Sequence, residues 1–165
     1  LDVYQIKARE SETDYPRMAL AALVKHKTLG PIRYVTSHLA HKSNMGATRK
    51  RQITEILNWL NKLESENPSK LIIFGGDFNT DIHHQTYSQE LDLLANSKFQ
   101  FRRSPSEGAN YSWVDENGSE KALIDYFFFF FLFKGPKTES QTKIYIQPIE
   151  ESLSDHALLI MTLDI

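Results

Sequence analysis

The stretch from Leu71 to Asp81, with the sequence LIIFGGDFNTD, constrains the fold of this chain more than any other. Its four apolar residues end at two glycines, and an acid, an aromatic and an amide follow directly. A short β-forming run bounded by glycine is typical of a buried strand. Asp77, Phe78 and Asn79 would then lie at the carboxyl end of that strand, where α/β sheets place ligand-handling residues. Strand alternation predicts Asp77 and Asn79 on one side and Phe78 on the other, so that a carboxylate and an amide can hold a water or a metal-bound oxyanion.

Length and composition limit the class of protein. The chain has 165 residues, which indicates a single domain, residues 1–165, large enough for a hydrophobic core. The formal net charge of -2 gives no overall basic field of the kind that nucleic-acid-binding domains carry, although a local basic patch stays open. The chain has no cysteine, which excludes disulfides and thiolate metal sites. We expect a soluble domain without a transmembrane segment and without a signal peptide in this chain, while its compartment and oligomeric state are not indicated.

The first part of the chain predicts strands. Apolar and polar residues alternate weakly over Leu1–Ile6, which is typical of an edge strand. The run Met18–Val24 fits a helix or a strand by its pattern, and the turn-forming segment Lys25–Pro31 favours a hairpin into the next run. Residues Ile32–Leu39 are β-branched and aromatic and predict a strand with His38 at its carboxyl end.

Two helices are predicted around the central strand. The longer one has an apolar stripe at three- and four-residue steps and ends at Asn67–Pro68, with Thr48 or Asn44 as its cap. The stripe consists of Ile53, Ile56, Leu57, Leu60 and Leu63. A shorter helix is expected near Tyr87–Ala95. Further strands are expected over 99–103, 111–114, 143–149 and 157–163, with a turn at 116–118.

The run Ala122–Phe133, with the sequence ALIDYFFFFFLF, is too short to cross a bilayer as a helix. A continuous apolar run without polar alternation is typical of a strand that is buried on both faces. Asp125 interrupts the run, and because a lone buried carboxylate is costly, it requires a partner.

Polar residues occur at one end of four predicted strands. They are His38, Asp77 with Asn79, Asp125, and Asp155 with His156. Each is weak evidence by itself, since a single histidine at a strand end is more often structural and Asn79–Asp81 can be simple turn chemistry. Together they suit metal-assisted attack of water on a phosphoester, because Mg²⁺ prefers carboxylate oxygens and imidazoles and amides stabilise charged phosphoryl oxygens.

Four short motifs in this order resemble the endonuclease/exonuclease/phosphatase superfamily, which includes DNase I-like nucleases, sphingomyelinases and inositol polyphosphate phosphatases. The motifs are Thr36–Leu39 (TSHL), Gly76–Asn79 (GDFN), Ile124–Tyr126 (IDY) and Ser154–His156 (SDH). The resemblance extends from Arg17 to the C-terminus and implies a metal-dependent phosphohydrolase.

The resemblance also implies roles for individual residues. Asp77 would orient or activate the attacking water, and Asn79 would bind the phosphate or that water. Asp155 would be a metal ligand, with Mg²⁺ as the cofactor and Mn²⁺ as the alternative. His156 would contact the scissile phosphate, with Asp125 fixing its tautomer and raising its basicity.

Two further residues are implied at the phosphate. His38 matches the additional histidine of the family, and Arg17, which follows Tyr15–Pro16, matches an arginine near the phosphate. The substrate would be a phosphoester in nucleic acid, in a phospholipid headgroup or in a small phosphodiester.

The chain also departs from the family pattern. The family's first third supplies an asparagine and a glutamate that is a principal metal ligand, whereas Glu10 and Glu12 lie in a charged loop of a different context. Leu123 stands where many members carry arginine. The chain therefore resembles the C-terminal two-thirds of the domain.

We predict an α/β (α+β) fold, a four-layer α/β/β/α DNase I-like sandwich without its N-terminal strands. The predicted function is metal-dependent hydrolysis of phosphoesters, more specifically phosphodiesters. The alternative is a catalytically inactive family remnant that binds a phosphate ligand or a protein.

The remaining polar and aromatic residues have simpler interpretations. His41, His83 and His84 are expected at the surface or in loops, and Asp81 in a turn. Tyr111 and Trp113 are expected as core or rim aromatics. The basic runs at 25–27, 49–51 and 102–103 are expected to be solvated, although positive charge at the start of a helix, as at 49–51, is unfavourable and favours an anionic partner.

Overall fold

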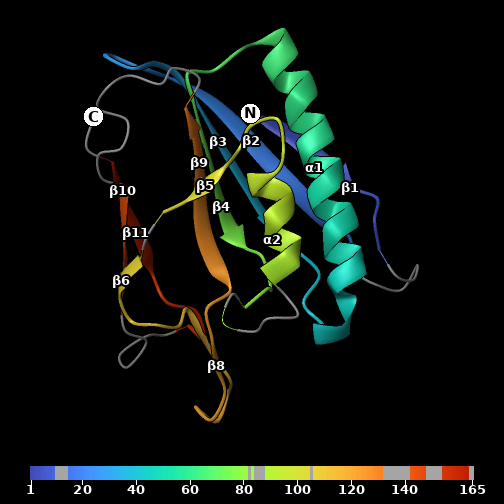
Figure 1. Ribbon diagram of the computed structural model, residues 1–165, viewed down its shortest axis with the longest axis vertical. Coiled ribbons are helices and arrows are strands. Elements are labelled where there is room, and N and C mark those ends of the chain that lie inside the picture. Colours follow the sequence, from blue (N-terminus) through green and yellow to red (C-terminus); the bar gives the residue numbers. More distant parts are fainter. Residues whose placement is uncertain are drawn as a thin grey trace.

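The computed structural model describes residues 1–9, 15–81, 83, 88–104, 106–131, 142–147 and 154–163. Figure 1 shows a large sheet with both helices on one of its faces and a smaller sheet on the other side. The helices are α1 (Gly46–Glu66) and α2 (Ser88–Ala95), and a short 3₁₀ turn, η1 (Ser43–Met45), leads into α1. The described residues thus form an α/β/β arrangement.

The large sheet has six strands in the order β1-β2-β3-β4-β9-β5. Their bounds are Asp2–Ile6 (β1), Arg17–His26 (β2), Gly30–His38 (β3), Leu71–Asp77 (β4), Asp125–Phe131 (β9) and Arg102–Arg103 (β5). The hairpin of β2 with β3 confirms the strand interpretation of residues 18–24, and β1 is the predicted edge strand.

The neighbours β3 and β4 are parallel, whereas the other pairs in this sheet are antiparallel. Helix α1 supplies the crossover that a parallel pair requires. The carboxyl ends of both strands therefore meet, with His38 opposite Asp77 in the register. Because β9 runs antiparallel to β4, its first residue, Asp125, also lies opposite Asp77. The topology brings three of the predicted site residues to one edge of the sheet.

A smaller sheet has the order β11-β10-β6, with bounds Leu159–Leu163, Thr142–Ile146 and Ser106–Gly108. A separate hairpin pairs β7 (Trp113–Val114) with β8 (Lys121–Ala122). The turn predicted at 116–118 lies in this hairpin, where Gly118 N donates to the Asp115 carbonyl over 2.9 Å.

Helix α1 packs its predicted stripe onto the large sheet. Ile53, Ile56, Leu60 and Leu63 are buried, and Leu57 is half-buried at the border of the same cluster. The predicted caps are wrong: Met45 precedes the helix without a side-chain cap, because η1 runs directly into it. Thr48 lies inside α1, where it is buried.

The phenylalanine run forms β9 and packs on both faces, as its continuous apolar character predicted. Tyr126 and Phe128 are buried on the helix side and contact Phe78, with ring centroids 6.0 and 5.2 Å away. Phe127 and Phe129 pack on the opposite face against Met161 of β11 and the buried cluster of Ile32, Leu71 and Ile73. Residues 132 and 133 lie outside the described part of the chain.

The second face of the large sheet is covered only in part. Met18, Leu20 and Tyr34 of β2 and β3 expose 55%, 37% and 43% of their surface there. Three of the four predicted layers are present: in the described part of the chain, no helix packs on the outer face of the small sheet (Figure 1). In the same part, no helix is both long enough and apolar enough to cross a membrane.

The close approach of β3 to β4 at Gly76 yields a test of this topology. Gly76 has a φ of +146°, and a Cβ atom there would lie 2.1 Å from the Ser37 carbonyl oxygen. We expect Gly76→Ala to lower the free energy of unfolding by roughly 2 kcal/mol or more in urea denaturation, because a backbone atom must move. The control is Gly118→Ala, which has a φ of +71° but open space around it and should cost only roughly 1 kcal/mol. Equal losses in the two variants would contradict the steric argument.

Candidate active site

The first part of the site is the parallel pair of β3 and β4. His38 ends β3 and Asp77 ends β4, and the His38 Nε2 atom lies 3.3 Å from Asp77 Oδ2. The backbone N–H of Leu39 donates to the Asp77 carbonyl over 2.9 Å, which joins the loop after β3 to the end of β4. An imidazole and a carboxylate are thereby fixed side by side at one edge.

Asn79 joins Asp77 through a turn and not through strand alternation. The strand ends at Asp77, and Phe78 is buried in the aromatic core. Asn79 has a φ of 50°, and its backbone N–H donates to Asp77 Oδ1 over 2.8 Å. Its Nδ2 donates to the Leu39 carbonyl over 3.1 Å. The interpretation by strand alternation is therefore wrong, and the alternative of turn chemistry at Asn79 is the one that the structure shows.

Asp125 and His156 come from two later segments. The His156 Nδ1 atom lies 2.9 Å from Asp125 Oδ2, and its Nε2 atom lies 3.9 Å from Asp77 Oδ2. His156 therefore stands between the two carboxylates, and Asp125 has the partner that its position required. The two acids and this imidazole each contribute a possible ligand atom, and these atoms lie within 4.8 Å of one another.

A residue that the sequence did not indicate, Ser112, orients this pair. Its hydroxyl is buried and accepts the backbone N–H groups of Ile124 (3.0 Å) and Asp125 (2.9 Å). Its carbonyl accepts the Ala157 N–H over 2.8 Å, and the next residue, Trp113, forms a β-bridge with His156. A lone serine in a loop has no periodic pattern, so only the folded contacts show this role.

The two carboxylates lie in a partly desolvated environment. Burial, followed by the nearby charge of Asp125, raises the pKa of Asp77 to about 6, against the opposing hydrogen bond from Asn79. Burial also raises the pKa of Asp125, and the hydrogen bond to His156 opposes this shift. Asp77 is therefore a base with a pKa close to neutral pH, which suits proton abstraction.

The two histidines shift in opposite directions. Burial, together with the charges of Arg17, His156 and His41, lowers the pKa of His38 to about 4. Burial also acts to lower the pKa of His156, but the hydrogen bond to Asp125 and the surrounding carboxylate charges outweigh it, so the pKa is raised. The site thus pairs a neutral imidazole with one that readily carries a proton.

A buried ion pair lies under the loops that carry these groups. Arg49 of α1 is fully buried, and its Nε donates to Glu90 Oε2 over 2.5 Å while Nη2 donates to Oε1 over 3.2 Å. The interpretation of residue 49 as solvated is wrong. Positive charge at the start of a helix favours an anionic partner, and for Arg49 that partner is Glu90 of the same chain.

The site opens into a cavity of about 520 Å³. Its walls include His38, Asp77, Asn79 and His156, together with Trp113 of β7 and His41. Trp113 is thus a rim aromatic, as expected. His41 lies at the surface as predicted, but its place in the cavity wall was not anticipated.

The remaining predicted residues lie at the margins. Arg17 is the first residue of β2, its Nη2 lies 3.1 Å from His41 Nδ1, and it lines an adjoining hollow with His38 and Asp77. Asp155 is exposed, and its carbonyl accepts the Val114 N–H over 3.0 Å. Asp155 is not one of the three clustered ligands, although its charge raises the pKa values of Asp125 and His156.

The remaining histidines and Tyr111 were expected at the surface, in loops or at the rim. His83 is exposed, and its backbone N–H donates to Asp81 Oδ1 over 2.9 Å, which is turn chemistry. His84 lies outside the described residues. Tyr111 lies at the rim hairpin, with the Lys121 ammonium 4.4 Å from its ring centroid.

The donor set fits a hard divalent cation. Two partly buried carboxylates with raised pKa values, beside one imidazole, form a group whose unfavourable charge a cation would relieve. Asp77, Asp125 and His156 are the described residues that could hold it.

Comparison with solved structures shows which family has this fold. A Bacteroides thetaiotaomicron endonuclease/exonuclease/phosphatase family protein superposes with a TM-score of 0.66 at 16% identity, over 97% of this chain and 60% of that one. The chain has the fold of the endonuclease/exonuclease/phosphatase family. It spans about 60% of the length of that relative.

Two further matches belong to the same structural group. A humanized Danio rerio TDP2 matches with a TM-score of 0.66 at 19% identity, over 100% of this chain and 67% of that one. The human Nocturnin catalytic domain with a bound sulfate matches with a TM-score of 0.57 at 16% identity, over 98% and 59%. No protein-family model and no curated protein matches the sequence. These superpositions show the endonuclease/exonuclease/phosphatase fold over part of the relatives' length.

The raised pKa of Asp77 predicts a stabilising substitution. Its folded-state pKa of about 6 exceeds the ordinary value of 3.8, so the folded chain binds the proton more tightly, and stability is lost as the pH rises through about 6. Asp77→Asn should therefore raise the free energy of unfolding at pH 7 by roughly 1 to 3 kcal/mol in metal-free buffer, and the gain should vanish below about pH 4. The control is Asp115→Asn, because hydrogen bonds from Glu120 and Ser119 lower the pKa of Asp115, so no gain is expected. A loss of stability in Asp77→Asn at pH 7 would contradict this electrostatic description.

The two site histidines should titrate in a defined order. We expect nuclear magnetic resonance titration of the metal-free protein to show His156 gaining its proton above the ordinary pKa of 6.5 and His38 gaining it near pH 4. Asp125→Asn should lower the pKa of His156, because the imidazolium then loses a charged acceptor. His38 protonating at a higher pH than His156 would be the contrary result.

Proposed function

We propose that the chain is a Mg²⁺-dependent hydrolase of phosphoesters, with phosphodiesters as the preferred class and Mn²⁺ as the alternative metal. The observation that carries this proposal is the position of the Asp77 carboxylate, 3.3 Å from His38 and 3.9 Å from His156, with Asp125 on the far side of His156. A base held beside two imidazoles suits in-line attack of water on phosphorus.

Asp77 is the group that orients and deprotonates the attacking water. Its pKa of about 6 leaves it ionised at neutral pH yet still basic enough to take a proton. The water oxygen forms the new bond to phosphorus, the ester P–O bond breaks, and the leaving oxygen departs as an alcohol after protonation from solvent. Asn79 supports this role, because its backbone N–H holds Asp77 Oδ1 over 2.8 Å.

His156 stabilises the phosphoryl oxygens with its Nε2–H group. Its Nδ1 atom is held by Asp125 at 2.9 Å, which fixes the tautomer and directs Nε2 toward Asp77. The raised pKa of His156 favours the charged form, whose positive charge matches the charge that develops on the phosphate. Asp125 is thus a positioning residue.

Phosphate binding falls to His38, Asn79 and Arg17. His38 and Asn79 line the cavity, and Arg17 lines the adjoining hollow beside Asp77. The sulfate bound in the similar Nocturnin domain is a tetrahedral oxyanion, as phosphate is.

The cation would be held by the cluster of Asp77, Asp125 and His156, and the family resemblance implies Asp155 as a further ligand. When bound, Mg²⁺ supplies Lewis-acid polarisation of a phosphoryl oxygen. The proposed partner is a phosphoester in nucleic acid, in a phospholipid headgroup or in a small phosphodiester.

The test is hydrolysis of bis(p-nitrophenyl) phosphate with Mg²⁺, with Mn²⁺ and with EDTA. We expect metal-dependent turnover that falls at least about 100-fold in Asp77→Ala and in His156→Ala, because each removes an acid–base or charge-stabilising group. Matched controls are Asp92→Ala and His83→Ala, which remove the same side chains from exposed positions and should retain full turnover.

Metal binding is measured in parallel by isothermal titration with Mn²⁺. A folded chain that neither turns over the diester nor binds Mn²⁺ would reject the hydrolase proposal. Binding of inorganic phosphate by such a chain would favour the inactive binding module instead.

A further inference from the structure

The side chain of Arg17 stands between two hollows at the edge of the sheet that carries the active site. One hollow has a volume of about 380 Å³ and is lined by His38 and Asp77, and the other has a volume of about 240 Å³ and is lined by His41. Arg17 lines both of them. An arginine side chain has many rotamers and can turn into either hollow, so a further contact has to decide where its guanidinium lies.

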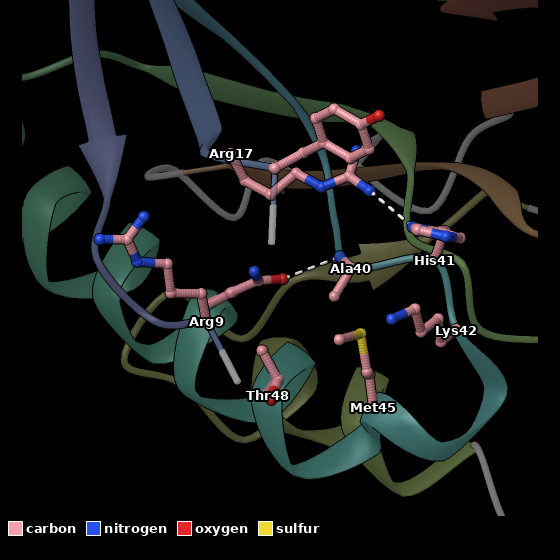
Figure 2. Close-up of a pocket in the computed structure, with 9 residues that line it drawn as sticks. Arg9, Arg17, Ala40, His41, Lys42, Met45 and Thr48 are labelled. Carbon is pink, nitrogen blue, oxygen red and sulfur yellow. Dashed lines mark hydrogen bonds between the residues drawn. The ribbon is translucent and has the colours of Figure 1, made fainter. Parts of the chain in front are cut away.

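That contact comes from His41. The Arg17 Nη2 atom lies 3.1 Å from His41 Nδ1, and Figure 2 shows the two side chains facing each other across this bond. A guanidinium group only donates hydrogen bonds, so Nδ1 of the imidazole is the acceptor and carries no proton. The proton of the neutral ring is therefore on Nε2, and the bond to Arg17 fixes the tautomer of His41.

The backbone on both sides of His41 is held by buried groups of α1. Gln52 is 1% exposed, and its Oε1 accepts the Ala40 N–H over 2.9 Å. Arg49 Nη1 donates to the carbonyls of Ala40 (3.0 Å) and Lys42 (2.7 Å). The imidazole is thus an acceptor at a defined place, although its own side chain is exposed.

A second group, Asp77, competes for Arg17. Burial lowers the pKa of Arg17, whereas the charge of Asp77 acts to raise it, so the guanidinium lies within electrostatic reach of this carboxylate. Within the described residues, however, the ion-pair partners of Asp77 are His38 and His156 and not Arg17. A direct pair with Arg17 would cover a carboxylate oxygen that the attacking water needs.

We propose that His41 is a positioning residue, which holds the Arg17 guanidinium at the phosphate and away from Asp77. The inference rests on the proposed function, in which Arg17 binds the phosphate. His41 acts through Arg17 and does not touch the reacting atoms. A guanidinium carries five N–H donors in a planar fork, and the bond to His41 uses one of them, so the others stay available to phosphate oxygens.

A double-mutant cycle of His41→Ala with Arg17→Met tests this inference, with the KM of bis(p-nitrophenyl) phosphate in Mg²⁺ as the readout. We expect His41→Ala to raise KM about three- to ten-fold and to leave kcat within about two-fold, because it weakens a contact to a charge that the bound substrate already carries. In the Arg17→Met background the same substitution should have no further effect, since no guanidinium is left to position.

Two further variants serve as controls. His41→Asn replaces Nδ1 by an amide oxygen that can also accept from Arg17, so KM should return to within about two-fold of the original value. His26→Ala removes another exposed histidine, whose Nδ1 accepts the Leu29 N–H over 3.2 Å at the opposite end of β2, and should leave KM unchanged. Because the Arg17–His41 contact is exposed, the His41 variants should unfold at the same urea concentration as the parent chain.

Binding of inorganic phosphate without metal separates this inference from the hydrolase proposal. The same four chains of the cycle are compared by isothermal titration. Coupling between His41 and Arg17 in phosphate binding, in a chain that does not hydrolyse the diester, would support the positioning role and reject the hydrolase.

Two results would overturn the positioning role and leave the hydrolase intact. The first is metal-dependent turnover in which the effects of His41→Ala and Arg17→Met on KM multiply, because His41 would then act on the substrate independently of Arg17. The second is a rise of KM in His41→Asn as large as in His41→Ala, because the acceptor atom alone would then not account for the role of His41.

Discussion

The ion pair of Arg49 with Glu90 is the interaction on which the site depends. Both side chains are removed from solvent, so each charge is tolerable only while the other is present. Arg49 also holds two carbonyls of the loop after β3, and Glu90 accepts the Thr80 hydroxyl over 2.6 Å from the loop after β4. One pair therefore ties α1 and α2 to the two loops that carry His41 and Asn79.

Above this ion pair, the fold brings two partly buried carboxylates together at one edge of the large sheet. The parallel register of β3 with β4 and the antiparallel register of β4 with β9 place Asp77 beside both His38 and Asp125. Partial burial then raises the pKa values of both acids. The hydrogen bonds from Asn79 and His156 offset only part of the cost of holding two carboxylates together. The remaining cost appears as the basicity that the proposed hydrolysis requires.

The sequence predicted those features that follow from local pattern. The apolar run of β4, the stripe of α1 and the phenylalanine run of β9 each have a period or composition that selects one structure. Polar residues at strand ends predicted that His38, Asp77, Asp125 and His156 would lie close together, because strand ends in one sandwich converge on one rim. The burial of Arg49, the orienting hydroxyl of Ser112 and the left-handed turn at Asn79 were not predicted, since each depends on a partner distant in sequence or on an alternative turn of equal local cost. The same limit applies to the helix cap, because η1 replaced the expected side-chain bond.

The hairpin of β7 with β8 contributes Trp113 and Glu120 to the cavity wall, yet only two residue pairs join its strands. Its inner anchor is Ser112, whereas its tip closes on itself through Asp115 and Glu120. Trp113 and Val114 bond to the backbone of His156 and Asp155, whereas the tip between Asp115 and Glu120 can vary in length and chemistry without disturbing the ion pair beneath the strand ends. A change of ligand would therefore require substitutions first at the tip of this hairpin, and the strand ends that hold Asp77, Asp125 and His156 could stay the same.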